Sequence, residues 1–365
     1  MQKLGAMNFR AWTLGIQLVL CLVWARAQPA LDGQARWPEG EVGVDYNAVN
    51  ASGERQGKWI RVWPDGTLYY EGQFDRGQPL GTFTFYYETC EVMSRIVHAE
   101  NPKYMQATHY RTGGQVRAEG GYLTTDERGE DGELVRVKTG TWRHYDAAGT
   151  LRIEEGWSDG VLDGPYTAFD GSGRMVEQGS YAGGEKEGMW STFNERGKAL
   201  IRVEYARGQF HGDYEVNDDL GRNLVVGRHA HGQPIGAWVH YNDDRTVHVV
   251  RKYEEGKVVM ERYENGVQRK EFKDERPQLE VHWENGKRHG PFTEWHDSGA
   301  WEVVDHTDPA TGERESRLEI QGQHVAREGA YFAGELHGVV TSYSEEGRLL
   351  KRETYDHGQL VGAAE

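Results

Sequence analysis

The sequence repeats with a period of 24 residues over most of its length, and this limits the available folds more than any other feature. Seven copies align on an opening glycine, taken here as position 0: Gly57, Gly140, Gly164, Gly188, Gly212, Gly236 and Gly338. Six of them carry Trp or Tyr at position 2, the exception being Val340, and all seven carry glycine at position 20. The five copies opening from Gly140 to Gly236 follow one another without a gap. Such a period indicates one supersecondary unit per copy.

Each unit has the pattern of a β-hairpin. In the copy that opens at Gly140, residues 140–145 are rich in aromatic and β-compatible types, which favours a strand. Residues 146–149 then predict a turn in which Gly149 takes a positive φ. Leu151 to Trp157 supplies the return strand, and residues 158–160 turn the chain towards the next copy. A lone hairpin is marginal in water, so the copies are expected to stabilise one another by stacking.

The expected fold class is therefore all-β, an elongated ribbon or rod of stacked antiparallel hairpin repeats. About a dozen units at two strands each would extend for ~115 Å, with a radius of gyration above about 30 Å. A globule of similar length would have a radius of gyration of about 20 Å. Trp190 occupies position 2 in the middle of the uninterrupted block, and its ring is expected to be buried.

These residues resemble the MORN-repeat variant found in many bacterial proteins. The pattern is Gly-x-Trp-x-x-Tyr, then Gly-x-Leu, then Tyr-x-x-Gly-x-x-x-Gly, and it extends from Gly57 to Gly362. Three segments are especially similar to the consensus: residues 263–266, 283–290 and 355–358. The resemblance implies an interaction scaffold. Many bacterial members are labelled as possible antitoxins, and lipid binding is also attributed to MORN repeats.

Two stretches interrupt the period. The repeat array is predicted over 57–362, after an N-terminal lead-in segment at 28–56, with inserts near 88–137 and 301–327. Within the inserts, Thr124–Glu133 and Asp305–Glu315 are polar and acidic, which predicts solvated loops. Neither has the fixed ligand spacing of a calcium-binding loop.

The N-terminus has the pattern of a signal peptide, predicted over 1–27. Lys3 and Arg10 precede a mostly apolar run of 14 residues at 11–24, and Ala25-Arg26-Ala27 predicts cleavage before Gln28. The run is shorter than the ~20 residues that span a bilayer, which disfavours an uncleaved anchor. A lipoprotein acylated on Cys21 is a further alternative, disfavoured by the large Leu20 before it. We expect a secreted or periplasmic protein of the bacterial cell envelope.

The charge of the chain disfavours nucleic acid as a partner. The formal net charge is −16, and removal of the three basic residues at 1–27 would make it −19. Nucleic acids and anionic membranes attract proteins through basic surfaces. We therefore expect neither nucleic acid binding nor, after signal cleavage, membrane insertion.

Cys90 would be the only thiol after that cleavage, which leaves no intramolecular disulfide. Its neighbours Glu88 and Glu91 are acidic, which raises a thiol pKa and lowers reactivity. We expect a passive cysteine.

Two motifs suggest chemistry, but both coincide with repeat positions. Gly156-Trp-Ser158-Asp-Gly160 matches the G-x-S-x-G nucleophile elbow, which requires a strand leading into a helix. Here a turn between strands is predicted instead. His229 and His231 could form half of a metal site on one strand face, but they occupy the aromatic position and a turn position. The same logic makes turn residues of three histidines that precede an opening glycine: His211, His289 and His337.

Two acidic stretches and the tryptophans have a structural interpretation too. Asn217–Asp219 and Asn242–Asp244 fall in the predicted turns, where Asp and Asn side chains bond to their own backbone. A paired-carboxylate glycosidase needs a cleft and a raised pKa, which such turns do not offer. Exposed tryptophans could stack on sugars, but many stand at the phased strand positions.

The sequence thus predicts an exported, non-catalytic scaffold for protein–protein interaction, with no catalytic, cofactor-binding or metal-binding residue. One alternative is a carbohydrate- or peptidoglycan-associated binding module, for which a glycan would be the partner. Another is an antitoxin or immunity-like protein. A third is an enzyme whose site lies in an insert, at Glu88–Val137 or Trp301–Arg327.

Overall fold

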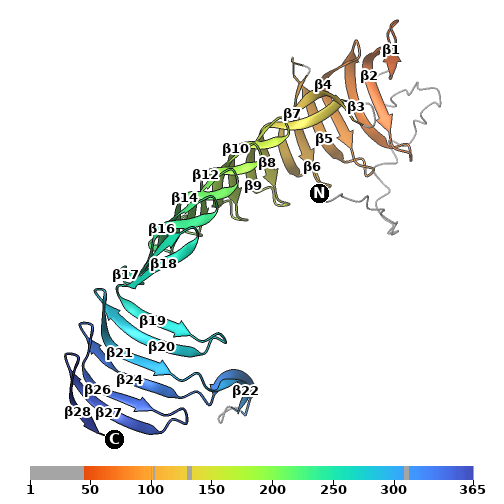
Figure 1. The fold of residues 1–365 in the computed structure, drawn as a ribbon. Helices are drawn as coiled ribbons and strands as arrows, with labels where there is room; N and C mark the ends of the chain where they lie inside the picture. The colour runs from red at the N-terminus through yellow and green to blue at the C-terminus, as the bar shows by residue number, and fades with distance from the viewer. Residues whose placement is uncertain (1–44, 100, 102, 130–133, 308–311, 365) are drawn as a thin grey trace. The chain divides into compact units, whose positions relative to one another are not determined.

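The computed structural model describes residues 45–99, 101, 103–129, 134–307 and 312–364. Every regular element among them is a β-strand, and each strand pairs antiparallel with its neighbours (Figure 1). This confirms the predicted all-β fold of stacked hairpins. The expected signal peptide and the first part of the 28–56 segment lie outside the described residues. In the part of the chain that is described, no helix has the length and apolar character needed to cross a membrane.

The chain divides into two compact units, Met1–Lys186 and Glu187–Glu365. In the first unit the strands pair in chain order. They are β1 (Ala48–Val49), β2 (Arg55–Val62), β3 (Leu68–Asp75), β4 (Gln78–Tyr86), β5 (Val92–His98), β6 (Tyr104–Tyr110), β7 (Val116–Arg128), β8 (Leu134–Tyr145), β9 (Leu151–Ser158), β10 (Val161–Phe169) and β11 (Met175–Ala182).

The second unit begins within β12 (Glu185–Phe193) and contains two runs of paired strands. The first run continues with β13 (Ala199–Ala206), β14 (Gln209–Asn217), β15 (Asn223–Ala230), β16 (Gln233–Tyr241), β17 (Val247–Glu254) and β18 (Lys257–Tyr263). The second contains β19 (Gly266–Glu271), β20 (Pro277–Glu284), β21 (Lys287–Trp295), β24 (Val325–Phe332), β25 (Glu335–Leu336), β26 (Gly338–Tyr343), β27 (Leu349–Asp356) and β28 (Gln359–Ala364). A separate pair is formed by β22 (Ala300–Thr307) and β23 (Arg314–Gln321).

The pairing register explains the 24-residue pattern. The opening glycine of a copy lies opposite the aromatic residue at position 17, as in Gly57 with Phe74 and Gly236 with Tyr253. Position 9 lies in the turn within each hairpin, where Gly149 has the expected positive φ of 81°. The next turn, between hairpins, has positive φ at both position 19 and position 20, as at Arg76 (47°) and Gly77 (76°). Two such residues form the tight turn whose twist suits antiparallel strands.

The side chain at position 2 is buried in most copies and half-buried in the others, such as Trp59 and Tyr166. Residues buried at this position include Phe83, Trp142, Trp190, Trp238, Phe292 and Val340. The expectation for Trp190 is confirmed, because only 2% of its surface is exposed. In several copies this side chain lies on a glycine at position 15 of the preceding copy, as Phe83 does on Gly72 and Trp238 on Gly227. A Cβ on Gly227 would lie 2.2 Å from the indole, so glycine allows the ring to approach the backbone.

The first predicted insert continues the sheet. Residues 92–128 form β5, β6 and β7, and Ile96, Met105 and Ala107 make a buried cluster there. A solvated loop was expected at Thr124–Glu133, and this is wrong for Thr124–Arg128. These residues belong to β7, in which Thr124 pairs with Arg136. The polar side chains predicted a loop because both faces of this end of β7 are accessible to water, so that the strand needs no apolar residues there.

The second predicted insert contains a hairpin outside the main pairing. Strands β22 and β23 pair with each other, while β21 pairs directly with β24 and keeps the repeat register, Gly290 opposite Tyr331. The loop expected at Asp305–Glu315 is therefore also corrected, since Asp305–Thr307 and Arg314–Glu315 are strand residues. The sequence of these two strands does not alternate between polar and apolar residues, because nearly all of their side chains are exposed.

Candidate functional site

The serine of the G-x-S-x-G motif lies at the end of a hairpin. Ser158 ends β9 and pairs with Val161, and Asp159 and Gly160 between them form a two-residue turn with φ of 48° and 82°. The nucleophile elbow requires a helix after the serine, and β10 follows instead. The predicted turn is confirmed, and the motif match is a consequence of the repeat.

His229 and His231 do not form the suggested pair. The ring of His229 packs among Phe210, Tyr214 and Trp238 at centroid distances of 5.0–5.2 Å, and burial lowers its pKa. His231 lies in the following turn with φ of 50°, and its ring faces His211 at 5.4 Å. The geometry thus brings together His211 and His231, a pair that the sequence did not indicate.

Cys90 occupies the turn position that glycine holds in most copies. It lies nine residues after Gly81, its φ is 67°, and its amide donates to the Tyr87 carbonyl at 2.9 Å. The side chain is half-buried and carries a thiol rather than a disulfide. The positive φ and the hydrogen bond of its amide show that Cys90 serves as a turn residue.

The acidic turns act on their own backbone, as predicted. Oδ1 of Asp218 accepts from the amides of Leu220 and Arg222, both at 2.9 Å. Hydrogen bonds from Arg222 lower the pKa of Asp218, and those from Thr246 lower the pKa of Asp244. Lowered pKa values keep both carboxylates ionised, whereas a general acid of a glycosidase needs a raised pKa.

One hollow opens within the first insert, between β5, β6, β7 and β8. Its volume is about 390 Å³, and its lining includes Val97, Tyr104, Met105, Gln106 and Thr139. These residues offer apolar surface, an amide, a hydroxyl and a phenol. They do not include the nucleophile and base pair that a covalent mechanism requires.

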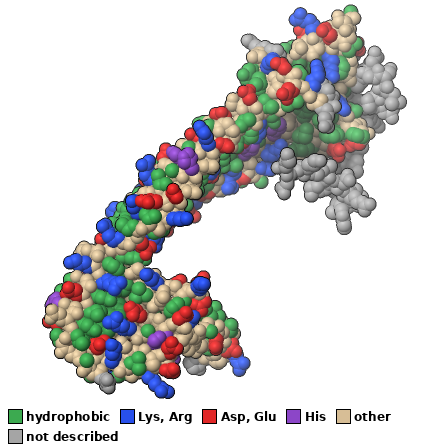
Figure 2. Space-filling view, in the orientation of Figure 1, with side chains coloured by type: hydrophobic (Ala, Val, Ile, Leu, Met, Phe, Trp, Pro, Cys, Tyr) green, Lys and Arg blue, Asp and Glu red, His purple; other side chains and the backbone are tan. Residues whose placement is uncertain are grey.

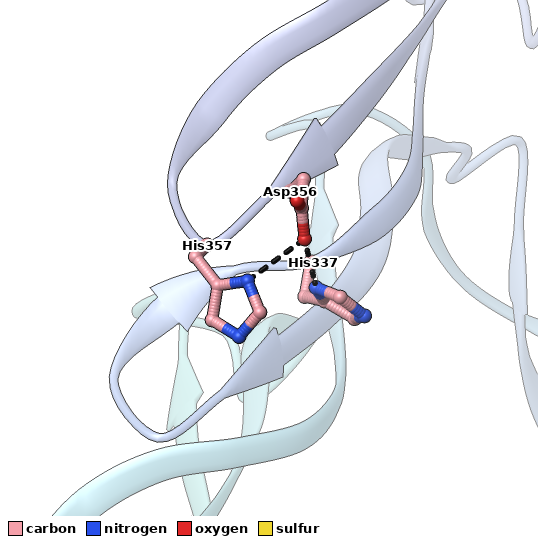
Figure 3. A group of neighbouring side chains, drawn as sticks. All are labelled: His337, Asp356 and His357. Atoms are coloured by element: carbon pink, nitrogen blue, oxygen red, sulfur yellow. Dashed lines mark hydrogen bonds and ion pairs between the residues drawn. The ribbon is translucent and has the colours of Figure 1, made fainter.

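Three side chains of types that can bind metals, His337, Asp356 and His357, lie together near the C-terminal end of the second unit and are called the His337 cluster (Figure 3). Oδ1 of Asp356 lies 2.8 Å from Nδ1 of His357 and 3.5 Å from Nδ1 of His337. The two imidazole rings are 5.1 Å apart, and all three side chains are exposed. The prediction that His211, His289 and His337 are turn residues is wrong, because His211 and His289 lie in β14 and β21 and His337 joins β25 to β26. The opening glycine continues the strand rather than ending a turn. Asp356 ends β27, and His357 lies in the turn that follows it.

The exposed surface of β18 is the clearest apolar feature. Val258, Val259 and Met260 are 48%, 52% and 42% exposed, the longest run of exposed large hydrophobic side chains in the described part of the chain. Val259 is the extra residue of a β-bulge between the pairs Lys252–Met260 and Tyr253–Val258, which interrupts the regular alternation of the strand there. Figure 2 shows basic, acidic and hydrophobic side chains interspersed on the face in view, without a large field of one charge.

Comparison with known proteins supports the repeat. Residues 336–357 match the family model described as MORN repeat variant. This segment contains all three residues of the His337 cluster. The match supports a MORN-type repeat in the copy that opens at Gly338. A search among curated proteins finds no match.

Solved structures give only weak likenesses. The chain aligns with a structure described as TcdB2-TccC3-Cdc42 at 10% identity and a TM-score of 0.13, covering 81% of this chain. It spans about 20% of the length of that protein. A porin-like protein from Bacteroides uniformis aligns at 10% identity and a TM-score of 0.11, covering 65% of this chain and 95% of that one. At these scores neither likeness carries an argument about fold or function.

Proposed function

We propose that this chain is an exported, non-catalytic repeat scaffold that binds a protein partner, with β18 part of the contact. The supporting observation is the run Val258–Met260, which exposes three large apolar side chains in sequence. Exposed apolar patches on soluble proteins commonly mark interaction sites.

The exposure of the aromatic residues favours a protein partner over a glycan. Sugar-binding modules present exposed rings, but the position 2 tryptophans Trp142, Trp190 and Trp238 are buried. Among the described tryptophans only Trp301 is exposed. Most of the described tryptophan rings are thus buried or half-buried in the sheet, where they cannot serve as exposed platforms for a sugar.

A binding experiment with a matched variant tests this function. The wild type, a variant with Val258, Val259 and Met260 changed to Ser, and Ser158→Ala would be immobilised and exposed to envelope extract with a chemical crosslinker. We expect one protein to be retained by the wild type and by Ser158→Ala, and lost from the β18 variant. Retention of that protein by all three would exclude β18, and capture of peptidoglycan without protein would contradict the scaffold.

Export has its own test. We propose cleavage before Gln28, on the basis of the basic and apolar segments and the Ala25-Arg26-Ala27 pattern. Intact-mass measurement of protein recovered outside the cytoplasm should give a chain that starts at Gln28. Retention of Met1, or a lipid on Cys21, would contradict this proposal.

A further inference from the structure

The repeat brings three side-chain positions together at the end of each copy. The amide of the position 20 glycine donates to the carbonyl two residues before the opening glycine, as Gly160 does to Lys138 at 2.9 Å and Gly358 to Leu336 at 2.8 Å. This bond places the residue just before the opening glycine, position −1, beside positions 18 and 19. The fold therefore presents one small group of three side chains per copy.

Side-chain contacts confirm this proximity in other copies. In the copy that opens at Gly57, the amide group of Gln56 donates to Asp75 at 3.1 Å and accepts from the backbone of Arg76 at 3.0 Å. In the copy that opens at Gly266, the amide of Asn285 donates to the Asn265 side chain at 3.0 Å. In these copies, position −1 thus interacts with position 18 or 19 although the residue types differ.

Two copies place histidine at both position −1 and position 19. His211 and His231 have ring centroids 5.4 Å apart, and His337 and His357 have them 5.1 Å apart. Position 18 distinguishes the two copies, since it is Ala230 in the first and Asp356 in the second. Only the second of these copies combines two imidazoles with a carboxylate.

We propose that His337, Asp356 and His357 bind a divalent transition-metal ion of the Zn²⁺ class. The ligand atoms of the three residues all lie within 4.8 Å of one another. Ligands of a tetrahedral ion at about 2.1 Å would be about 3.4 Å apart, so small side-chain rotations complete the site. Two imidazole nitrogens and one carboxylate oxygen suit Zn²⁺, and water would fill the remaining position.

The backbone at the cluster is already fixed. His357 has φ of 44° and Gly358 of 76° in their two-residue turn, which the Gly358–Leu336 bond holds against the neighbouring strand. His337 donates its own amide to the Ala330 carbonyl at 3.0 Å. Only side-chain rotation is needed to admit an ion, which reduces the entropy cost of binding.

Zn²⁺ titration of the metal-free full chain, followed by calorimetry, tests the proposal. We expect one equivalent to bind to the wild type, and at least a tenfold weaker affinity in Asp356→Asn and in His357→Asn. Asparagine tolerates positive φ, and Asn285 already stands at position 19 of another copy with φ of 51°. Thermal melts of the variants would establish that they remain folded.

Two further variants give the test its specificity. Asp75→Asn removes the same charge at position 18 of a copy without histidine, and it should bind Zn²⁺ as the wild type does. Ala230→Asp supplies the missing carboxylate beside His211 and His231, and it should add a second equivalent. Absence of saturable binding below about 1 mM in the wild type, or wild-type affinity in Asp356→Asn and His357→Asn, would overturn the proposal.

Discussion

At the scale of single residues, the glycine at position 15 determines how closely successive copies can stack. A Cβ on Gly227 would lie 2.2 Å from the ring of Trp238, whereas one on Gly171 would meet nothing closer than 3.9 Å. We expect Gly227→Ala to destabilise the fold by roughly 1–3 kcal/mol, because the ring or the strand must shift. Gly171→Ala should change stability by less than about 0.5 kcal/mol. Urea denaturation of both variants measures the difference, and equal stabilities would contradict the close approach.

Tryptophan at position 2 should contribute more to stability than any turn residue. Trp190→Ala is expected to cost about 3–5 kcal/mol, the usual range when a buried large aromatic side chain is truncated. Ser158→Ala, at an exposed hairpin end, should leave the thermal melt and any activity of the protein unchanged. If Ser158→Ala abolished an activity without changing the melt, the non-catalytic proposal would be wrong.

His98 should make the first unit sensitive to mild acid. Burial, with a smaller contribution from Arg136, lowers the pKa of His98 to about 4, and its buried Nδ1 has no hydrogen-bond partner among the residues that the structure describes. Because the unfolded chain takes up this proton near pH 6.5, stability should be full above that pH and fall as pH decreases towards 4. We expect the wild type to lose about 1 kcal/mol more than His98→Gln between pH 7 and pH 5, since the ring is only partly buried. Equal losses in denaturation at the two pH values would refute this assignment.

At the scale of elements, the hairpin β22–β23 should be dispensable for folding. Strands β21 and β24 pair without it, and its two ends meet where a Cβ on Gly322 would lie 3.6 Å from the Cα of Gly299. Excision of residues 300–321, with Gly299 joined to Gly322, loses the bond from Trp301 to the Asp274 carbonyl, worth about 1 kcal/mol. The melting temperature should therefore fall only slightly. Loss of cooperative unfolding after this excision would show that the hairpin belongs to the core.

The hairpins themselves could be predicted from the sequence because their landmarks recur. Glycine at positions 9 and 20 and the aromatic at position 2 mark the turns and the core, and the structure confirms both. Strands β5 to β7 were missed as part of the sheet because Ile96, Met105 and Ala107 fill their core without a glycine or aromatic period. The glycine at position 15 was missed because its role depends on a ring in the next copy.

The metal-ligating cluster could not be found by comparing copies position by position. Such a comparison sets His337 beside His211 and His289, which suggests three turn residues. The cluster appears only when positions −1, 18 and 19 of one copy are placed together, and this requires the two-residue turn and the bond between Gly358 and Leu336. Once known, that juxtaposition can be read from the sequence of any copy.

At the scale of the whole molecule, the fold predicts that damage stays local. Within each unit, extensive contacts among the described strands join only strands that pair side by side. In arrays of this kind stability is approximately a sum of unit and nearest-neighbour contributions, so a defect spreads no further than the adjoining copies. The 24-residue period thus predicts a protein that unfolds in segments rather than in a single step.

Trp142 is the site at which to test this locality. Its ring is 1% exposed, its Nε1 donates to the Gly121 carbonyl at 2.9 Å, and Lys138 lies 4.6 Å from its centroid. In Trp142→Ala, hydrogen exchange measured by mass spectrometry should accelerate in β7, β8 and β9. Protection in β2 and β3 of the same unit should remain within error of the wild type, because neither strand contacts the altered one extensively. A uniform loss of protection across the first unit would mean that it unfolds as one cooperative body, and the description of independent stacked copies would have to be abandoned.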